Sequence, residues 1–279
     1  MPELPETETI ARDLNARVPG ARIVGVQVWR EDVLRGVSAA DLASRVSGQC
    51  IWRVWRRAKL IVLDLGSANK LAGHIVVQPR FTGGVLVDDG TLPAELREYL
   101  TVSFMLEDRR QLHYRDVRRL GTLAWMLPGQ FDAYAGALGP EPLGDGFSSA
   151  TLRESLGDST RVVKAALMDQ TKLAGVGNIY ATEALWDAGI DPSRATRSLS
   201  TVEWHALHEA LQRILAASIE ARGTSFRDYR DASGGRGAYV GQLRAYGREG
   251  QPCVRCGRRL IGTHAIDGRN TVFCAGCQC

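Results

Sequence analysis

Apolar positions recur along the 279-residue chain with two different periods. Near the start, Ile10, Leu14 and Val18 have the spacing of one face of an amphipathic helix, which predicts a helix over residues 6–18. From residue 21 to residue 127 the pattern changes to short runs rich in β-branched and aromatic residues, namely ARIVGVQVW, KLIVLDL, HIVVQPRF, YLTVSFML and GTLAWML. Turn signals such as GSAN and DDG separate these runs, and the combination predicts an antiparallel β-sandwich or barrel.

The second half of the chain combines irregular and helical segments. Residues 131–149 are rich in Gly and Pro and are interpreted as a hinge, whereas residues 150–223 have helical periodicity. In that helical part, Ser200 and Glu203 form a capping box for one helix, and Asn178 is expected to cap another. We therefore predict an α+β fold, with an N-terminal sheet domain followed by a helical domain and an irregular end.

Composition is that of an ordinary globular protein, with 44% hydrophobic and 24% charged residues. No apolar stretch approaches the roughly 20 residues of a membrane span, and the acidic N-terminus does not resemble an export signal, so we expect a cytoplasmic protein.

Charge is unevenly distributed along the chain. Residues 222–279 contain ten Arg, no Lys and four acidic residues, a net charge of +6, which leaves −2 for the rest of the chain. A basic end suits contact with a polyanion, although a solvated Arg-rich tail explains it equally well.

Four of the six cysteines are regularly spaced. Cys253, Cys256, Cys274 and Cys277 form the pattern C-x2-C-x17-C-x2-C, in which each close pair supplies two thiolates and a hairpin brings the pairs together. Four sulfur ligands leave tetrahedral zinc no open position, so the pattern predicts one structural Zn²⁺ and no catalytic metal. Disulfides are the alternative, and the cytosol disfavours them.

The N-terminus, MPELPETE, offers an unusual nucleophile. Once Met1 is removed, Pro2 presents a secondary amine, and an α-amino group titrates near pH 8, about two units below lysine. Such an amine can attack a sugar C1′ atom and form a Schiff base, and Glu3 beside it can move protons. Acidic residues also open helices simply because they suit the helix dipole, so this pattern alone leaves both explanations open.

Several motifs together resemble a known family. The opening MPELPETE, the segment LMDQTKLAGVGNIYATEALWDAGIDP, the segment YGREGQPC and the ending GRNTVFCAGCQ occur in the order typical of the formamidopyrimidine-DNA glycosylases, within the wider family that includes endonuclease VIII. Leu4 is similar to the purine-repair branch, because the endonuclease VIII branch typically has Gly there. The resemblance spans essentially the whole chain. It implies a catalytic β-sandwich domain over 1–130, a hinge over 131–149, a helix–two-turn–helix domain over 150–223, a lid over the lesion at 224–246 and a zinc finger over 247–279.

The resemblance also implies roles for individual residues. Pro2 corresponds to the Schiff-base nucleophile and Glu3 to the proton donor that helps to open the sugar ring. Glu6 corresponds to a residue of the pocket that contains these two. Lys59, in RRAKLIVLDL, corresponds to a lysine that contacts phosphate beside the lesion and assists strand cleavage. Arg269, which has a catalytic role by this resemblance, is expected at the tip of the zinc-finger hairpin.

The same transfer places a DNA-binding surface in the second half of the chain. Asn178 and Arg269 resemble the pair that holds the phosphates of the lesion from two sides, and Gly177 lets backbone N–H groups approach a phosphate at a helix start. Lys164 and Tyr246 are placed among the DNA-binding residues. Glycines in the lid are expected to provide mobility, and DNA is expected in the cleft between the two halves of a monomer.

One part of the chain departs from the family pattern. The family fills the space left by a flipped base with a methionine, an arginine and a phenylalanine. Here YRDVRRLG keeps the arginine as Arg118 but has Leu120 in place of the aromatic ring. Alignment on TGG puts Phe81 at the methionine position, whereas alignment on the upstream histidine puts Val77 there. Arg97 is expected to replace a DNA-contacting histidine.

These features predict a bifunctional DNA glycosylase and abasic-site lyase of base excision repair. Its substrates are expected to be duplexes that contain oxidised purines, such as 8-oxoguanine and formamidopyrimidines, and strand cleavage is expected to occur by β,δ-elimination. One alternative is an endonuclease VIII-like enzyme for oxidised pyrimidines, which Leu4 and the lid sequence disfavour. The other is a non-catalytic DNA-damage-binding protein, which the presence of Pro2, Glu3 and Lys59 disfavours.

Overall fold

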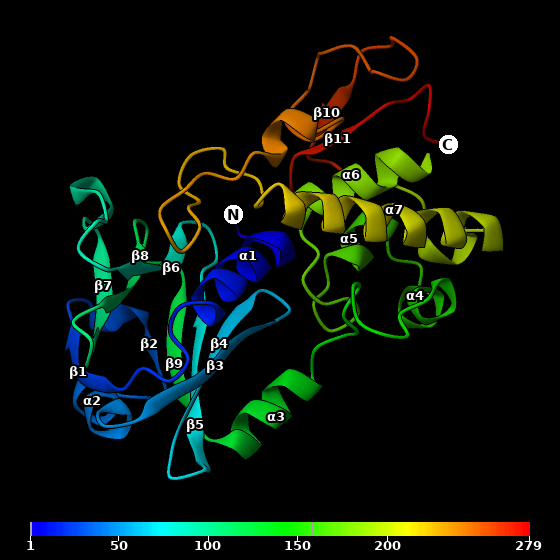
Figure 1. Ribbon diagram of the computed structural model, residues 1–279. Helices are drawn as coiled ribbons and strands as arrows, with labels where there is room; N and C mark the ends of the chain where they lie inside the picture. Colours follow the sequence, from blue (N-terminus) through cyan, green and yellow to red (C-terminus); the bar gives the residue numbers. More distant parts are fainter. Residues whose placement is uncertain (1, 158) are drawn as a thin grey trace. The chain divides into compact units, whose positions relative to one another are not determined.

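The computed structural model describes residues 2–157 and 159–279, whose course is drawn in Figure 1. The described chain forms two compact units. The first extends to Gly136 and also includes Ala221–Ala238, and the second consists of Ala137–Glu220 and Tyr239–Cys279. Within the described residues, no helix combines the length and apolar character needed to cross a membrane. The chain thus returns to the first unit after the long helix of the second.

Two largely antiparallel sheets form the body of the first unit, which confirms the predicted β-sandwich. The four-stranded sheet has the order β1-β7-β8-β6, with β1 at Ile23–Val28, β6 at Gly83–Asp88, β7 at Leu100–Leu106 and β8 at Gln111–Asp116. The five-stranded sheet has the order β2-β9-β5-β4-β3, with β2 at Leu34–Arg35, β3 at Cys50–Arg57, β4 at Leu60–Ser67, β5 at Lys70–Gln78 and β9 at Thr122–Met126. The sequence pattern did not predict β2, β3, β6 and β8, because charged or glycine-rich stretches interrupt their apolar alternation.

Strand β5 is shorter than the apolar run HIVVQPRF suggests. It ends at Gln78, because Pro79 has no N–H for the sheet and Arg80 has a φ of 51°, in the left-handed region. Phe81 therefore lies in the loop between β5 and β6 rather than in a strand. This ending of β5 determines where the side chain of residue 81 is displayed.

Helix α1, Leu4–Asn15, packs against β3 and β4 of one sheet and β6 of the other. It begins and ends earlier than the predicted 6–18. Its apolar face, with Ile10 and Leu14 fully buried, joins the hydrophobic core between the sheets. Helix α2, Ala39–Val46, packs against β1 and is capped by the Ser38 hydroxyl, which accepts from the Asp41 N–H. Helix α1 is consequently anchored in the core between the two sheets.

The predicted hinge over 131–149 begins inside a helix. Helix α3, Pro128–Gly136, starts with a proline. The first turn of a helix tolerates proline, because the N–H group that proline lacks would have no partner within the helix there. The Phe131 ring packs edge-on against Trp55 and lies 4.8 Å from the ring of His74, centre to centre. The first part of this segment is thus packed on the sheet, and its residues from Ala137 onwards belong to the second unit.

Helices dominate the second unit. They are α4 at Ser149–Leu156, α5 at Val163–Leu167, α6 at Asn178–Ala188 and α7 at Thr201–Glu220, and Figure 1 shows α6 beside α7. The capping box predicted for α7 is confirmed, because the Ser200 N–H donates to Glu203 Oε2 at 2.7 Å and the Glu203 N–H donates to Ser200 Oγ at 3.3 Å. The prediction that Asn178 caps α6 is wrong. Gly177, in an extended conformation, is the cap, and Asn178 is the first helical residue.

The end of the chain forms a short hairpin of β10, Ile261–Thr263, and β11, Thr271–Phe273. This hairpin lies between the two cysteine pairs, as the sequence predicts. Buried Trp186 of α6 packs with Cys253, Leu260, Val272 and Cys274 in one hydrophobic cluster. Short 3₁₀ turns complete the described chain, at Glu31–Val33, Ala94–Leu96, Thr196–Ser198 and Tyr239–Gln242.

Candidate functional site

Pro2 and Glu3 are buried immediately before α1, and Glu3 has no exposed surface. The Glu3 N–H donates to Glu6 Oε2 at 2.9 Å. The Glu6 side chain, in the first turn of α1, therefore holds the backbone at Glu3 in place. Glu6 is also buried, with 1% of its surface exposed. The structure therefore brings three of the predicted site residues together within the first unit. Met1, whose removal the chemistry requires, lies outside the described residues.

Glu6 also connects the N-terminus to the segment 221–238. Its second oxygen, Oε1, accepts the Thr224 N–H at 2.7 Å. Gly223 makes this approach possible, because it has a φ of 84° and a Cβ there would lie 3.0 Å from the Glu6 side chain. One buried carboxylate thus binds both the residue after Pro2 and the first part of the predicted lid.

The segment 221–238 is held by its own polar contacts. Arg222 donates to Asp231 Oδ2 at 2.6 and 2.9 Å and to Asp13 of α1 at 2.6 Å. The Ser225 hydroxyl donates to the Tyr229 carbonyl at 3.0 Å. The structure requires glycine at positions 234, 235 and 237. Gly234 has a φ of 87°, and a Cβ atom at either of the other two positions would lie within 2.6 Å of a neighbouring atom. These contacts define a folded resting conformation for this segment.

Lys59 occupies the tight turn between β3 and β4. Arg57 pairs with Leu60 across the turn, and Ala58 adopts a φ of 52°. The Arg56 guanidinium donates to the Ala58 carbonyl at 3.0 Å and to Glu8 of α1 at 2.7 Å. Half-buried Lys59 is therefore carried on a turn that is fixed to the N-terminal helix.

Two loops that connect the sheets carry three exposed side chains. Phe81 is 42% exposed, and the guanidinium carbon of Arg118 lies 5.3 Å from the centre of its ring. Leu120 is 39% exposed on the same loop as Arg118, whereas Val77 is only 1% exposed inside the core. The alignment on TGG therefore puts an exposed side chain at this position, and the alignment on the upstream histidine puts a buried one there.

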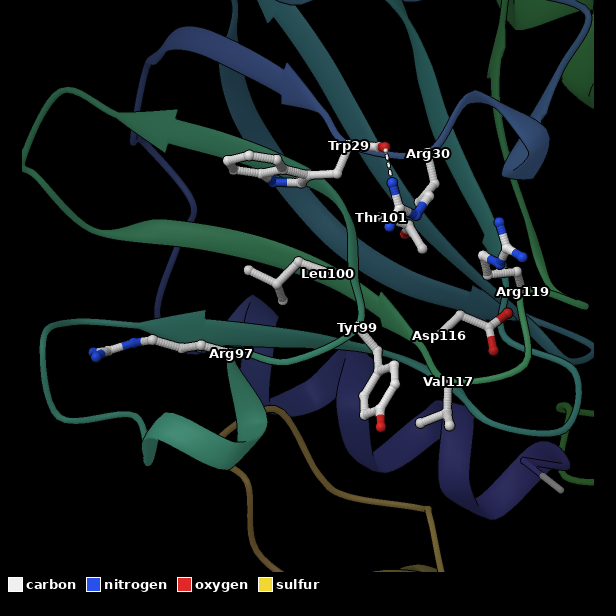
Figure 2. Close-up of a pocket in the computed structure, with 9 residues that line it drawn as sticks. All are labelled: Trp29, Arg30, Arg97, Tyr99, Leu100, Thr101, Asp116, Val117 and Arg119. Atoms are coloured by element: carbon white, nitrogen blue, oxygen red, sulfur yellow. Dashed lines mark hydrogen bonds between the residues drawn. The ribbon is translucent and has the colours of Figure 1, made fainter.

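A pocket of about 660 Å³ lies beside the loop that carries Arg118, with Val117 and Arg119 in its lining (Figure 2). Arg97 and Arg119 stand at opposite ends of it, and Trp29 and Tyr99 expose their rings there. Arg97 donates two hydrogen bonds to Asp88, at 2.7 and 3.0 Å. The contact holds the pKa of Asp88 down at about 2. The guanidinium predicted to contact DNA thus has an acidic partner in the first unit.

In the second unit, α6 and the hairpin approach each other at Asn178. Its Nδ2 donates to the Asn270 carbonyl at 3.1 Å, next to Arg269, and no donor among the described residues reaches its buried Oδ1. Gln170 shapes the loop before the helix, accepting the Gly175 N–H at 2.9 Å and donating to the Val176 carbonyl at 2.9 Å. Arg269 is exposed at the hairpin tip, where the sequence predicts it. The two residues expected to hold phosphates are therefore on adjoining elements.

Lys164 has a position that the sequence did not predict. The residue is fully buried on α5, and its ammonium group donates to Asp267 Oδ2 at 2.9 Å and Thr271 Oγ1 at 2.8 Å. Because the side chain has no exposed surface, a DNA contact would require the group to become exposed. Its geometry instead fastens the hairpin to the helical part of the second unit.

Glu183 was missed by sequence reasoning. Its buried carboxylate accepts the backbone N–H groups of Arg244, Ala245 and Tyr246 at 2.8, 2.9 and 2.7 Å. Burial raises the pKa of Glu183, although all three donors favour its ionised form. The contact fixes the backbone of half-buried Tyr246 at the entry to the cysteine-bearing end. No local pattern reveals it, because the partners lie about 60 residues away in the chain.

The four spaced cysteines form one cluster, with their sulfur atoms all within 4.8 Å of one another. The Sγ atoms of Cys253 and Cys277 are 4.0 Å apart, and those of Cys256 and Cys274 are 3.4 Å apart. Disulfide sulfurs lie about 2.05 Å apart, whereas four sulfurs about 2.3 Å from one tetrahedral ion are separated by about 3.8 Å. The arrangement fits a tetrahedral metal site. Cys50 and Cys279 lie outside it.

Comparison with known proteins agrees with this architecture. The family described as the formamidopyrimidine-DNA glycosylase N-terminal domain matches residues 1–123, and the corresponding H2TH domain matches residues 138–230. Formamidopyrimidine-DNA glycosylases from Carboxydothermus hydrogenoformans and Laribacter hongkongensis are 39% and 38% identical, over the full length of this chain and of each relative.

Solved structures are similar over the same extent. Lactococcus lactis Fpg, as a mutant bound to DNA that contains Fapy-dG and in complex with abasic-site DNA, is 32% identical with a TM-score of 0.89 and covers 99% of both chains. The MutM (Fpg) protein from Thermus thermophilus is 34% identical with a TM-score of 0.86, covering 99% of this chain and 98% of that one. The chain therefore belongs to the formamidopyrimidine-DNA glycosylase family, and it is an enzyme of base excision repair.

Proposed function

We propose that this enzyme removes oxidised purines from duplex DNA through Pro2 and then cleaves the strand at the resulting abasic site. The observation that carries the proposal is buried Pro2, which is followed by the fully buried carboxyl group of Glu3, whose backbone N–H donates to Glu6. A secondary amine held beside a buried acid has the two functions that Schiff-base chemistry at a sugar needs. Fapy-dG and abasic-site DNA, bound by the Lactococcus lactis relative, are the substrates we transfer to this chain.

The reaction begins with attack of the Pro2 nitrogen lone pair on C1′ of the damaged nucleotide. A bond forms between the Pro2 nitrogen and C1′, and the glycosidic bond to the base breaks, with the base leaving together with a proton. Glu3 donates a proton to the ring oxygen as the C1′–O4′ bond opens, which leaves an iminium ion. Loss of a C2′ proton then expels the 3′ phosphate, and a second elimination expels the 5′ phosphate. Water finally releases the sugar fragment and restores the amine.

The other residues hold DNA in position. Lys59, on its fixed turn, contacts the phosphate beside the lesion. Asn178 and Arg269, on adjoining elements of the second unit, hold phosphates at the start of α6, where the helix dipole favours anions. Phe81, Arg118 and Leu120 fill the space that the extruded base leaves.

The segment that begins at Thr224 covers the extruded base. Its connection to Glu6 supports this role, because the same carboxylate also holds the residue after the nucleophile. The metal of the cysteine cluster is zinc, bound by Cys253, Cys256, Cys274 and Cys277, and it stabilises the hairpin that carries Arg269.

Borohydride trapping tests the central step. Borohydride reduces the iminium ion to a stable amine, so a protein–DNA adduct should form on an 8-oxoguanine duplex, and mass spectrometry should locate it on the processed N-terminal peptide. Glu3→Gln keeps the amine but removes the proton donor, and should trap far more slowly. An adduct on Lys59, with an unmodified Pro2, would overturn the assignment of the nucleophile. A preference for an oxidised-pyrimidine duplex would favour the endonuclease VIII-like alternative.

A further inference from the structure

Two loops of the first unit run side by side because of the way the strands pair. Strand β5 ends at Gln78, opposite Thr122 of β9, and strand β6 begins at Gly83, opposite Asp116 of β8. The loops 79–82 and 117–121 therefore both cross from one sheet to the other at the same end of the strands. The first carries Phe81. The second carries Arg118 and Leu120.

Asp116 is the group that both loops share. Its side chain is buried, with 1% of the residue exposed, and Oδ1 accepts the Thr82 hydroxyl at 2.5 Å and the Arg118 N–H at 3.3 Å. The other oxygen, Oδ2, accepts the Gly121 N–H at 2.7 Å and the Tyr114 hydroxyl at 3.4 Å. The Thr82 hydroxyl also accepts the Arg118 N–H at 3.0 Å. One carboxylate thus connects the residue after Phe81 with both ends of the loop that carries Arg118 and Leu120.

We propose that Asp116 is a positioning residue that sets the spacing between Phe81 and Arg118, and through them the extrusion of the damaged base. This inference rests on the proposed function of the two loops. Figure 2 shows Asp116 beside Val117 and Arg119, at the start of the second loop. Two exposed side chains on separate loops can keep a fixed separation only if the loops beneath them are connected. Without Asp116, the backbone of each loop loses the contact that relates it to the other.

The hydrogen-bond chemistry predicts that only a carboxylate satisfies this position. Each carboxylate oxygen of Asp116 accepts one backbone N–H group, from Arg118 or from Gly121, and such a group can only donate. An amide at residue 116 would therefore place its own NH2 group against one of these two N–H groups in either orientation. Asp116→Asn should therefore behave like Asp116→Ala. Thr82→Val removes the hydroxyl between the loops but leaves the contact of Asp116 with Gly121. Thr82→Ser keeps the hydroxyl and serves as the matched control.

The test compares two substrates under single-turnover conditions, an 8-oxoguanine duplex and a duplex with a preformed abasic site. Asp116→Ala and Asp116→Asn should slow excision from the first by about tenfold or more, the size expected from loss of a buried charge-assisted hydrogen bond, and change cleavage of the second far less. Thr82→Val should lie between these variants and the wild type, and Thr82→Ser should resemble the wild type. The ratio of the two rates is informative because a loss of folded protein lowers both equally.

Equal losses on both substrates would mean that Asp116 only stabilises the fold, and would overturn the inference. Phe81→Ala separates this failure from failure of the proposed function: if it changes the ratio while Asp116→Ala does not, only the role of Asp116 is wrong. Hydrogen–deuterium exchange gives a readout that needs no activity. Segments 79–83 and 117–121 should both lose protection in Asp116→Ala, and unchanged protection would also overturn the inference.

Discussion

The guanidinium carbon of Arg118 lies 5.3 Å from the centre of the Phe81 ring, although the two residues belong to different loops. A cation at this distance from a ring face is attracted to it. The pair presents an exposed aromatic surface together with hydrogen-bond donors. This chain has an aromatic ring at position 81 and an aliphatic side chain at position 120.

Phe81→Ala should slow excision of 8-oxoguanine from duplex DNA far more than it slows cleavage at a preformed abasic site. Stacking on an aromatic ring is worth on the order of 1–3 kcal/mol per base, and less stacking has to be broken at an abasic site. Leu120→Ala is the matched control with the smaller expected effect, since its side chain offers less stacking area. Single-turnover rates on the two substrates provide the measurement. Similar losses on both would identify Phe81 as a structural residue.

Arg118 should make the enzyme sensitive to the base opposite the lesion. Guanidinium donors match the O2 and N3 acceptors of an orphaned cytosine, so 8-oxoguanine opposite cytosine should be excised faster than the same lesion opposite adenine. Arg118→Ala should reduce this preference as well as the rate. If the variant loses rate but keeps the same preference, the discrimination resides elsewhere.

Zinc should be bound in one equivalent per chain. Cys256→Ala should release it, loosen the hairpin 261–273 and weaken DNA binding, because metal binding and local folding are coupled. Metal analysis of protein purified without chelators checks the stoichiometry. Cys279→Ala, outside the cluster, is the control and should retain the metal.

Substitution of Arg269 should weaken phosphate binding, whereas substitution of Lys164 should lower the stability of the fold. Arg269→Ala should weaken binding to damaged and undamaged duplexes alike and reduce the slope of log K against log salt by about one. Lys164→Met should instead lower thermal stability, because it leaves buried Asp267 without its cation. An unchanged salt slope for Arg269→Ala would make that residue solvated surface.

The Asp88–Arg97 pair should give the first unit a defined acid sensitivity. The hydrogen bonds from Arg97 lower the pKa of Asp88 from 3.8 to about 2, so its stabilisation is complete above pH 4 and is lost as the pH falls through about 2. Arg97 is partly exposed, so solvent screens the pair, and Arg97→Gln should lower the free energy of unfolding at pH 5 only slightly. The difference from wild type should shrink towards pH 2. His113 also faces Asp88 at 3.5 Å and is present in both proteins. A difference independent of pH would contradict this account.

The features that depend on local pattern could be predicted from the amino-acid sequence alone. Period and turn signals predicted α1, the sandwich and the capped start of α7, because neighbouring residues decide helix and strand formation. The cysteine spacing predicted the hairpin and the cluster, since two close pairs can meet in few ways. The N-terminal motif and the order of the later motifs identified the family, and the resemblance gave the site residues that we propose.

Which residues share a buried partner depends on the tertiary structure. It brought Asp116 to Thr82, Glu6 to Thr224, Glu183 to residues 244–246 and Lys164 to Asp267. It also exposed Phe81 and buried Val77. The physical reason is common to all of these. A hydrogen bond or ion pair between distant residues depends on strand register and on how elements pack, and periodicity along the chain carries no information about either.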